Sequence, residues 1–145
     1  MNIYDCIIYY DEDLILDLRF NLLNKYVTKF VVVESCYTHS GKKRDLKFDI
    51  KKFLKFKNKI IYIPVSTLPK NIEEIKISDS EHQKNAKILT NALKRENYHR
   101  NQIEVALKDC GENDLIIISD ADEIPNLENF THKGEISLFC QKMFY

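Results

Sequence analysis

The order of apolar segments along the chain is the sequence feature that most limits how it can fold. Short apolar runs at 3–10, 30–34, 60–65 and 115–119 alternate with segments whose apolar residues recur at helical spacing. This alternation is typical of an α/β fold, a mostly parallel sheet with helices on both faces. Ligands bind such sheets beyond the carboxyl ends of the strands, so the residues after each run are the candidate site.

Three segments between the runs are predicted to be helical. The first begins at Asp13 and has leucines at positions 14, 18, 22 and 23, and the second is lysine-rich, with apolar residues at 46, 50, 53 and 54. The third is long, from about Ile88 to Cys110, with Gly111 as a left-handed cap. We expect an irregular excursion at 66–87 and a fifth strand at 136–145, all within one domain over residues 1–145.

The long helix can be placed against the last strong strand. It should run antiparallel to that strand, which rises about 17 Å over five residues. Because a helix rises about 1.5 Å per residue, the residue about 11 positions before the end of the helix should lie level with Asp120. The segment 96–101 is therefore expected beside the residues after that strand. On the face defined by positions 93, 103 and 107, Glu96 and Arg100 occupy core-facing places. These charges indicate a site, although a solvated i,i+4 pair gives the same pattern.

Composition excludes several classes of protein. The chain has 22 basic and 22 acidic residues, so nucleic-acid binding is not expected. Its three glycines are too far apart to form a phosphate-binding loop. No apolar run approaches the roughly 20 residues that span a bilayer, and no basic segment of a signal peptide precedes Arg19. We therefore expect a cytoplasmic protein, with four reduced cysteines and with histidines that are structural or solvent-facing.

The motif with the clearest chemistry follows the run at 115–119. Asp120 and Asp122 stand in D-x-D spacing, followed by Glu123. Two carboxylates so close favour a cation, and hard oxygen ligands favour Mg²⁺ or Mn²⁺, whose shell substrate phosphates complete. Acidic residues in a solvated turn are the simpler alternative. A Walker B strand lacks its phosphate loop here, and the motif lies too near the end of the sequence for a haloacid-dehalogenase-like phosphatase. A GT-A type nucleotide-sugar transferase fits best.

Several separated blocks also resemble a known family. They are Ile3-Tyr4-Asp5-Cys6 with Glu12, Asp17 and Arg19; Val31-Val32-Val33-Glu34 with Thr38, Ser40, Gly41 and Lys42; Arg95-Glu96-Asn97 with Arg100-Asn101; and 117–125. In this order they resemble glycosyltransferase family 17, the β-1,4-mannosyl-glycoprotein β-1,4-N-acetylglucosaminyltransferase-like proteins. The resemblance implies a UDP-N-acetylglucosamine donor, a divalent metal and inverting transfer to a glycan hydroxyl.

The resemblance also implies roles for individual residues. Asp120 and Asp122 would hold the metal and the diphosphate. Glu123 would support these two ligands from behind or contact the sugar. Glu34 would accept hydrogen bonds from the uridine or its ribose, unless it caps a helix or a loop. Arg100 and Lys42 would offset diphosphate charge, unless Lys42 belongs to a solvated basic face with its neighbours Lys43 and Arg44. Asn101 would orient Asp120 or the ribose, and Glu12 would touch the nucleotide or cap the first helix.

The end of the sequence departs from the family pattern. An inverting transferase needs a carboxylate base to take the acceptor's proton, and only Glu128 and Glu135 follow the acidic motif, neither within a motif that marks it as the base. We therefore expect a C-terminally truncated transferase fold whose general base lies elsewhere. A fragment that binds a nucleotide sugar or a partner without completing transfer is the alternative, and a metal-dependent phosphohydrolase is a third possibility.

Overall fold

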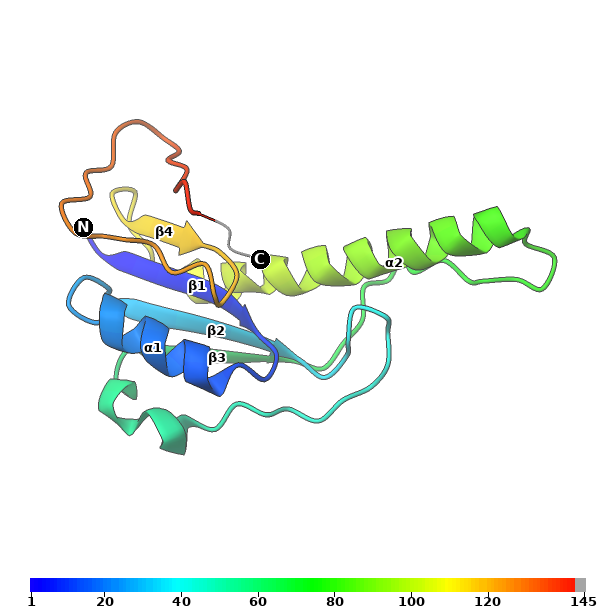
Figure 1. The fold of residues 1–145 in the computed structure, drawn as a ribbon, viewed down its shortest axis with the longest axis horizontal. Helices are drawn as coiled ribbons and strands as arrows, with labels where there is room; N and C mark the ends of the chain where they lie inside the picture. The colour runs from blue at the N-terminus through cyan, green and yellow to red at the C-terminus, as the bar shows by residue number, and fades with distance from the viewer. Residues whose placement is uncertain (143–145) are drawn as a thin grey trace.

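Four parallel strands form the centre of the molecule. The computed structural model describes residues 1–142 (Figure 1). The sheet order is β3-β2-β1-β4, which confirms the expected parallel α/β fold. The strands are β1 (Ile3–Tyr9), β2 (Lys29–Ser35), β3 (Ile60–Val65) and β4 (Leu115–Ile118). Because β2 and β4 lie on opposite sides of β1, the carboxyl ends of β1 and β4 flank a topological switch point.

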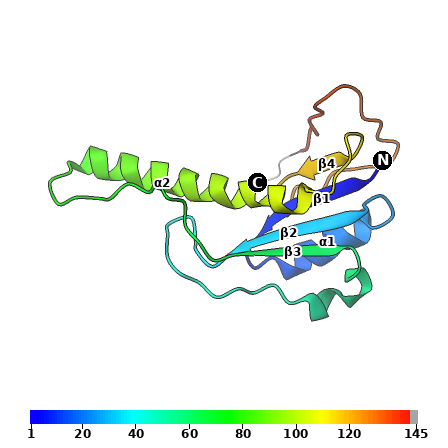
Figure 2. The same cartoon turned by 180° about the vertical axis from the view of Figure 1, so that it is seen from behind.

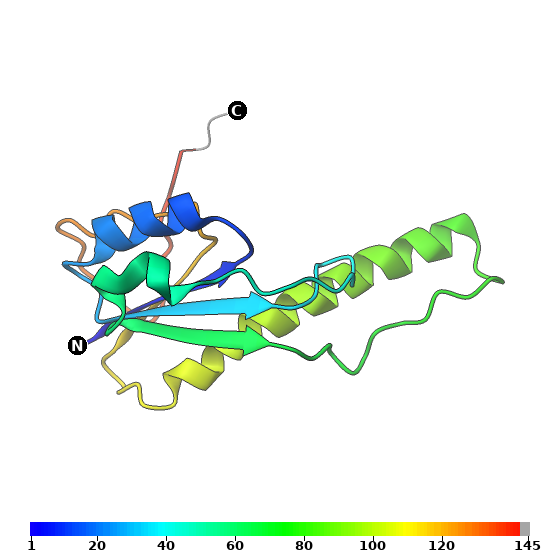
Figure 3. The same cartoon turned by 90° about the horizontal axis from the view of Figure 1, so that it is seen from below.

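Helices cover both faces of the sheet. The helix α1 (Asp13–Leu23) and the 3-10 helix η1 (Ile50–Phe56) share one face, as Figure 3 shows. On the other face lie the C-terminal part of α2 (Glu81–Asn101) and the 3-10 helix η2 (Gln102–Leu107). The N-terminal part of α2 extends well beyond the sheet (Figure 2). No helix within residues 1–142 is long and apolar enough to cross a membrane.

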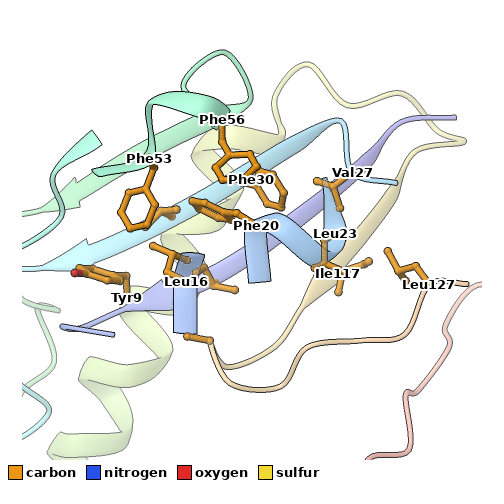
Figure 4. Close-up of a cluster of buried hydrophobic side chains, with 13 residues drawn as sticks. Tyr9, Leu16, Phe20, Leu23, Val27, Phe30, Phe53, Phe56, Ile117 and Leu127 are labelled. Atoms are coloured by element: carbon orange, nitrogen blue, oxygen red, sulfur yellow. The ribbon is translucent and has the colours of Figure 1, made fainter. Parts of the chain in front are cut away.

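Two buried clusters hold these layers together. The larger lies between the sheet and the α1 layer, where Phe20 packs against Phe30, Phe53 and Phe56 with ring centroids 4.3–5.5 Å apart (Figure 4). The smaller lies under η2 and consists of Tyr4, Cys6, Val31, Val33, Val65 and Ile103. The alternating side chains of the strands thus supply one cluster on each face.

The structure corrects the predicted face of the first helix. Leu16, Phe20 and Leu23 are buried, whereas Leu14 and the leucines at 18 and 22 are exposed. Of the four leucines whose helical spacing predicted this helix, only Leu23 is in the core. The helix is apolar on several sides, so spacing alone does not determine which side faces the sheet.

Both expected bounds of the long helix, near Ile88 and at Cys110, are also wrong. The helix α2 begins at Glu81 rather than near Ile88, because Ser80 and Gln83 form a capping box there. It ends at Asn101, and Leu93, expected to face the core, is half exposed. The lysine-rich segment forms only the short 3-10 helix η1.

The predicted fifth strand is not formed over residues 136–142, where Ile136 and Leu138 are exposed. Residues 143–145 of that prediction lie outside the described residues.

Candidate functional site

A cavity of about 610 Å³ opens at the carboxyl ends of the strands. Its walls come from four places in the sequence: the residues after β1, those after β2, the last turns of α2 and the turn after β4. The polar and aromatic residues that line it are Tyr9, Tyr10, Glu12, Ser35, Tyr37, His39, Arg44, Glu96, His99, Arg100, Asp120 and Asp122. The cavity therefore lies at the switch point between β1 and β4, where ligands of open α/β sheets bind.

A buried arginine fixes the acidic turn after β4. Arg19 of α1 donates two hydrogen bonds to the Asp5 carboxylate, Nε to Oδ2 at 2.8 Å and Nη2 to Oδ1 at 2.7 Å. Its Nη1 donates to the backbone carbonyl oxygens of Asp120, Ala121 and Glu123 at 2.9, 3.2 and 3.1 Å. Because a planar guanidinium holds its partners in fixed directions, Arg19 sets the orientation of this turn.

The two aspartates of the turn differ from Asp5 in their surroundings. Asp120 and Asp122 are exposed and line the cavity. Asp120 Oδ1 accepts a hydrogen bond from Arg100 Nη2 of α2 at 3.2 Å. The predicted placement of 96–101 beside the acidic motif is thus confirmed. Arg100 Nη2 also lies 3.3 Å from Glu96 Oε1, so Arg100 makes the i,i+4 ion pair as well as the contact with the acidic turn.

The donor set of the turn suits a hard divalent cation that binds with its substrate. Within residues 1–142, no group of three or more His, Cys, Asp or Glu side chains is placed to hold a metal ion by itself. Asp120 and Asp122 offer two carboxylates at the cavity wall. Mg²⁺ and Mn²⁺ are commonly held by one or two carboxylates and complete their shells with water and phosphate oxygens. The two carboxylates therefore suit a divalent cation that binds together with a phosphate-containing substrate.

Glu34 is used inside the protein. Its buried carboxylate accepts hydrogen bonds from the backbone N–H groups of Lys47 and Phe48 at 2.7 and 3.0 Å and from the Tyr62 hydroxyl at 2.9 Å. Arg44 Nη1 lies 3.0 Å away. These contacts match the loop-cap alternative, and they leave Glu34 outside the lining of the cavity.

The structure places the remaining predicted residues in different positions. Glu12 lines the cavity, with its carboxylate accepting hydrogen bonds from the backbone N–H groups of Tyr10 and Asp11. Lys42 and Asn101 are exposed and do not line it. Glu123 accepts a hydrogen bond from the backbone N–H of Asp120 at 3.0 Å, which stiffens the acidic turn.

Sequence reasoning missed the imidazole and tyrosine side of the cavity. His99, predicted to be structural or solvent-facing, is 2% exposed and lines the cavity, as does His39, with ring centroids 6.2 Å apart. Burial, assisted by the neighbouring His39 and Arg44, lowers the pKa of His99 to about 4, so its ring is neutral near pH 7. Arg44 also stacks over the Tyr10 ring, 4.1 Å from its centroid.

One sequence signal could have identified this side. His99 lies one turn of helix after Glu96, which was already predicted to face the site. Arg44 and His39 lie in a loop, where hydrophobic periodicity does not indicate which way a side chain points.

Comparison with known proteins adds to this geometry. No curated protein and no solved structure shows a significant match. The family model described as Glycosyltransferase family 17 matches residues 1–141, which include every residue of the cavity. The chain therefore belongs to glycosyltransferase family 17.

Proposed function

We propose that this chain is a metal-dependent GT-A type glycosyltransferase. It transfers N-acetylglucosamine from a UDP-sugar to a glycan hydroxyl with inversion, as the β-1,4-mannosyl-glycoprotein β-1,4-N-acetylglucosaminyltransferase-like proteins of its family would. The observation that carries this proposal is the exposed pair Asp120 and Asp122, held by Arg19 at the wall of the cavity. Membership of the family supplies the reaction class, glycosyl transfer.

The two sides of the cavity suit the two halves of a nucleotide sugar. The residues after β2 and those after β4 lie on opposite sides of β1, so roughly 10 Å separates them. On the β2 side, Tyr37 is joined by Tyr10, whose ring lies under Arg44, and by His99, whose ring lies near His39. These flat rings suit a nucleobase. The β4 side carries the two aspartates and Arg100, which suit a metal-bound diphosphate.

The protein's own contribution to the chemistry is to position charge. Bound at Asp120 and Asp122, Mn²⁺ or Mg²⁺ would act as a Lewis acid toward the departing diphosphate. Arg100 lies beside the same carboxylate and can offset negative charge that develops on that leaving group. Arg19 keeps the turn fixed while this charge forms, because it is fully buried and all three of its side-chain nitrogens donate hydrogen bonds, to Asp5 in β1 and to residues 119–123.

A second cavity suits the acceptor. It has a volume of about 600 Å³, shares Asp120 and Asp122 with the first, and is lined also by Glu123 and residues 137–139. A glycan seated there would reach the acidic turn from the side opposite the nucleotide. Inversion requires the acceptor oxygen to attack the sugar carbon on the face opposite the departing diphosphate, so the acceptor needs a place of its own beside the turn.

Calorimetric titration with UDP, with and without Mn²⁺, tests the proposal. We expect Mn²⁺-dependent binding that is lost when Asp120→Asn and Asp122→Asn are combined. The matched control combines Asp109→Asn with Glu112→Gln, which removes two exposed carboxylates outside the cavity. Binding that is independent of Mn²⁺, or equal in the two double variants, would contradict the proposal.

A further inference from the structure

A buried histidine of the cavity wall has hydrogen-bonding capacity that the described residues do not use. Within residues 1–142, two buried side-chain atoms have no hydrogen-bond partner, His99 Nε2 and Arg95 Nε. Of these two residues, His99 lines the cavity and Arg95 does not. Leaving a buried polar group unpaired costs stability, so such a group in the wall of a binding cavity marks a place where a ligand can pair with it.

His99 stands on the side of the cavity that suits a nucleobase. Its ring centroid lies 6.2 Å from that of His39, in the loop after β2. The next residue of α2, Arg100, instead contacts Asp120 in the turn after β4. Successive residues of a helix point about 100° apart, so these two side chains reach the two sides of the cavity. The helix thus presents an imidazole to one side and a guanidinium to the other.

The surroundings of His99 suit an uncharged ligand group better than a phosphate. Arg44 already pairs with the buried Glu34, Nη1 to Oε1 at 3.0 Å, and its guanidinium lies over the Tyr10 ring. Burial holds the pKa of His99 low, so its ring offers no positive charge to a phosphate near pH 7. Tyr10 and Tyr37 supply flat surfaces beside it. A planar base with a polar edge meets these conditions.

We propose that His99 Nε2 accepts a hydrogen bond from the N3–H group of the uracil base, which makes His99 the residue that reads the edge of the base. This inference rests on the proposed function, because it assigns a contact within the same nucleotide site. A neutral imidazole has one N–H donor and one acceptor nitrogen. Under-used acceptors are commoner in protein interiors than orphaned N–H donors, so the ring carries its proton on Nδ1. Nε2 then offers a lone pair, and N3–H is the donor on the edge of uracil.

The base reaches Nε2 when the His39 ring turns aside. Nε2 is buried, and the ring of His39 lies next to that of His99. The His39 side chain is exposed, so its ring can rotate into solvent. The backbone there stays in place, because Arg95 Nη1 donates a hydrogen bond to the carbonyl oxygen of His39 at 2.9 Å. Binding therefore replaces one ring beside His99 with another and leaves the loop where it is.

A nucleotide methylated at N3 tests this contact, because the methyl group removes the donor and leaves the ribose and the diphosphate unchanged. In calorimetry with Mn²⁺, we expect the wild type to bind N3-methyl-UDP about tenfold more weakly than UDP. His99→Phe keeps a flat ring without an acceptor, so it should bind the two nucleotides alike. His82→Phe, the same change at an exposed histidine outside the cavity, should keep the wild-type difference. Equal binding of both nucleotides by the wild type, or the full difference in His99→Phe, overturns the proposal.

Nitrogen-15 NMR of the histidine rings tests the same contact in the wild-type protein, with His99→Phe used to identify the signal. We expect His99 Nε2 to be unprotonated and its signal to shift when UDP and Mg²⁺ are added. Pyrophosphate with Mg²⁺, which lacks the base, should not shift it. A protonated Nε2, or equal shifts with both ligands, overturns the proposal. A wild type that binds no UDP contradicts the proposed function as well, whereas UDP binding that leaves the His99 signal unchanged contradicts this inference alone.

Discussion

Arg19 and Asp5 form a fully buried ion pair, with Arg19 Nη2 2.7 Å from Asp5 Oδ1. Asp5 is in the central strand β1 and Arg19 is in α1. The same guanidinium donates to backbone carbonyl oxygens of the turn that carries Asp120 and Asp122. The pair therefore connects the core of the sheet to the candidate metal ligands.

Removing one partner of this pair should destabilise the protein strongly. Arg19→Ala or Asp5→Ala leaves a buried charge without its partner, for which we expect a loss of about 3–5 kcal/mol in the free energy of unfolding. Urea denaturation measures this loss. Lys52→Ala, which breaks the exposed pair between Lys52 and Asp13, is the control and should have a much smaller effect. Similar losses in the buried and exposed variants would contradict this role of Arg19.

Arg100 should contribute to diphosphate binding. We expect Arg100→Gln to weaken Mn²⁺-dependent UDP binding about tenfold, the usual scale for losing one charge-assisted contact. Uridine, which has no phosphate, should bind the variant and the wild type equally. Titration calorimetry with both ligands separates these effects, and Lys94→Gln, on the same helix but outside the cavity, is the control. Equal weakening of uridine would show that Arg100 acts on the shape of the cavity instead.

Gly41 should tolerate a side chain less well than Gly134. Both have positive φ, 88° and 86°, so alanine at either position costs about 1–2 kcal/mol of backbone strain. At Gly41 a Cβ would also lie 2.7 Å from Arg95 Nη2, whereas nothing lies within 4 Å at Gly134. Thermal unfolding should show a larger loss for Gly41→Ala. Combining it with Arg95→Ala should remove the excess, and an unchanged excess would contradict the contact.

His99 should make stability depend on pH. Its pKa of about 4 in the folded protein lies below the 6.5 of an ordinary histidine, so the unfolded chain binds more protons between these values. The free energy of unfolding should therefore rise with pH from about 4 to about 6.5, by about 3 kcal/mol from this residue. Urea denaturation at several pH values measures the slope. His99→Gln should reduce it, whereas the exposed His82→Gln should not; equal slopes in all three proteins would contradict this assignment.

Local patterns predicted the strands and the position of the acidic turn. Each of the four strands is an apolar run bounded by polar residues, and burial on both faces of a parallel sheet requires such runs. The D-x-D pair follows directly after β4, so the sheet places it at the correct edge. Arg100 could also be placed in advance, because the rise of a helix and the rise of a strand are both fixed by backbone geometry.

Other features depend on contacts between residues far apart in the sequence. Arg19 meets Asp120 and Glu123 across more than a hundred positions, and no local spacing contains that information. The sequence does contain two unusual charges. Asp5 lies inside an apolar strand, and Arg19 lies among apolar residues of the first helix. Neither signal identifies its partner until the strand and the helix are packed together.

The sequence by itself determined the alternation of strands and helices, the parallel sheet and the acidic turn at its carboxyl edge, because these follow from side-chain periodicity and backbone geometry. Only the tertiary structure decided which face of α1 is buried, that Glu34 serves a loop and that His99 lines the cavity. Apolar residues on several sides of α1 allow more than one orientation, and a polar side chain can serve the core or the site equally well. Packing against the sheet makes that choice, because each buried polar group must find its partner there.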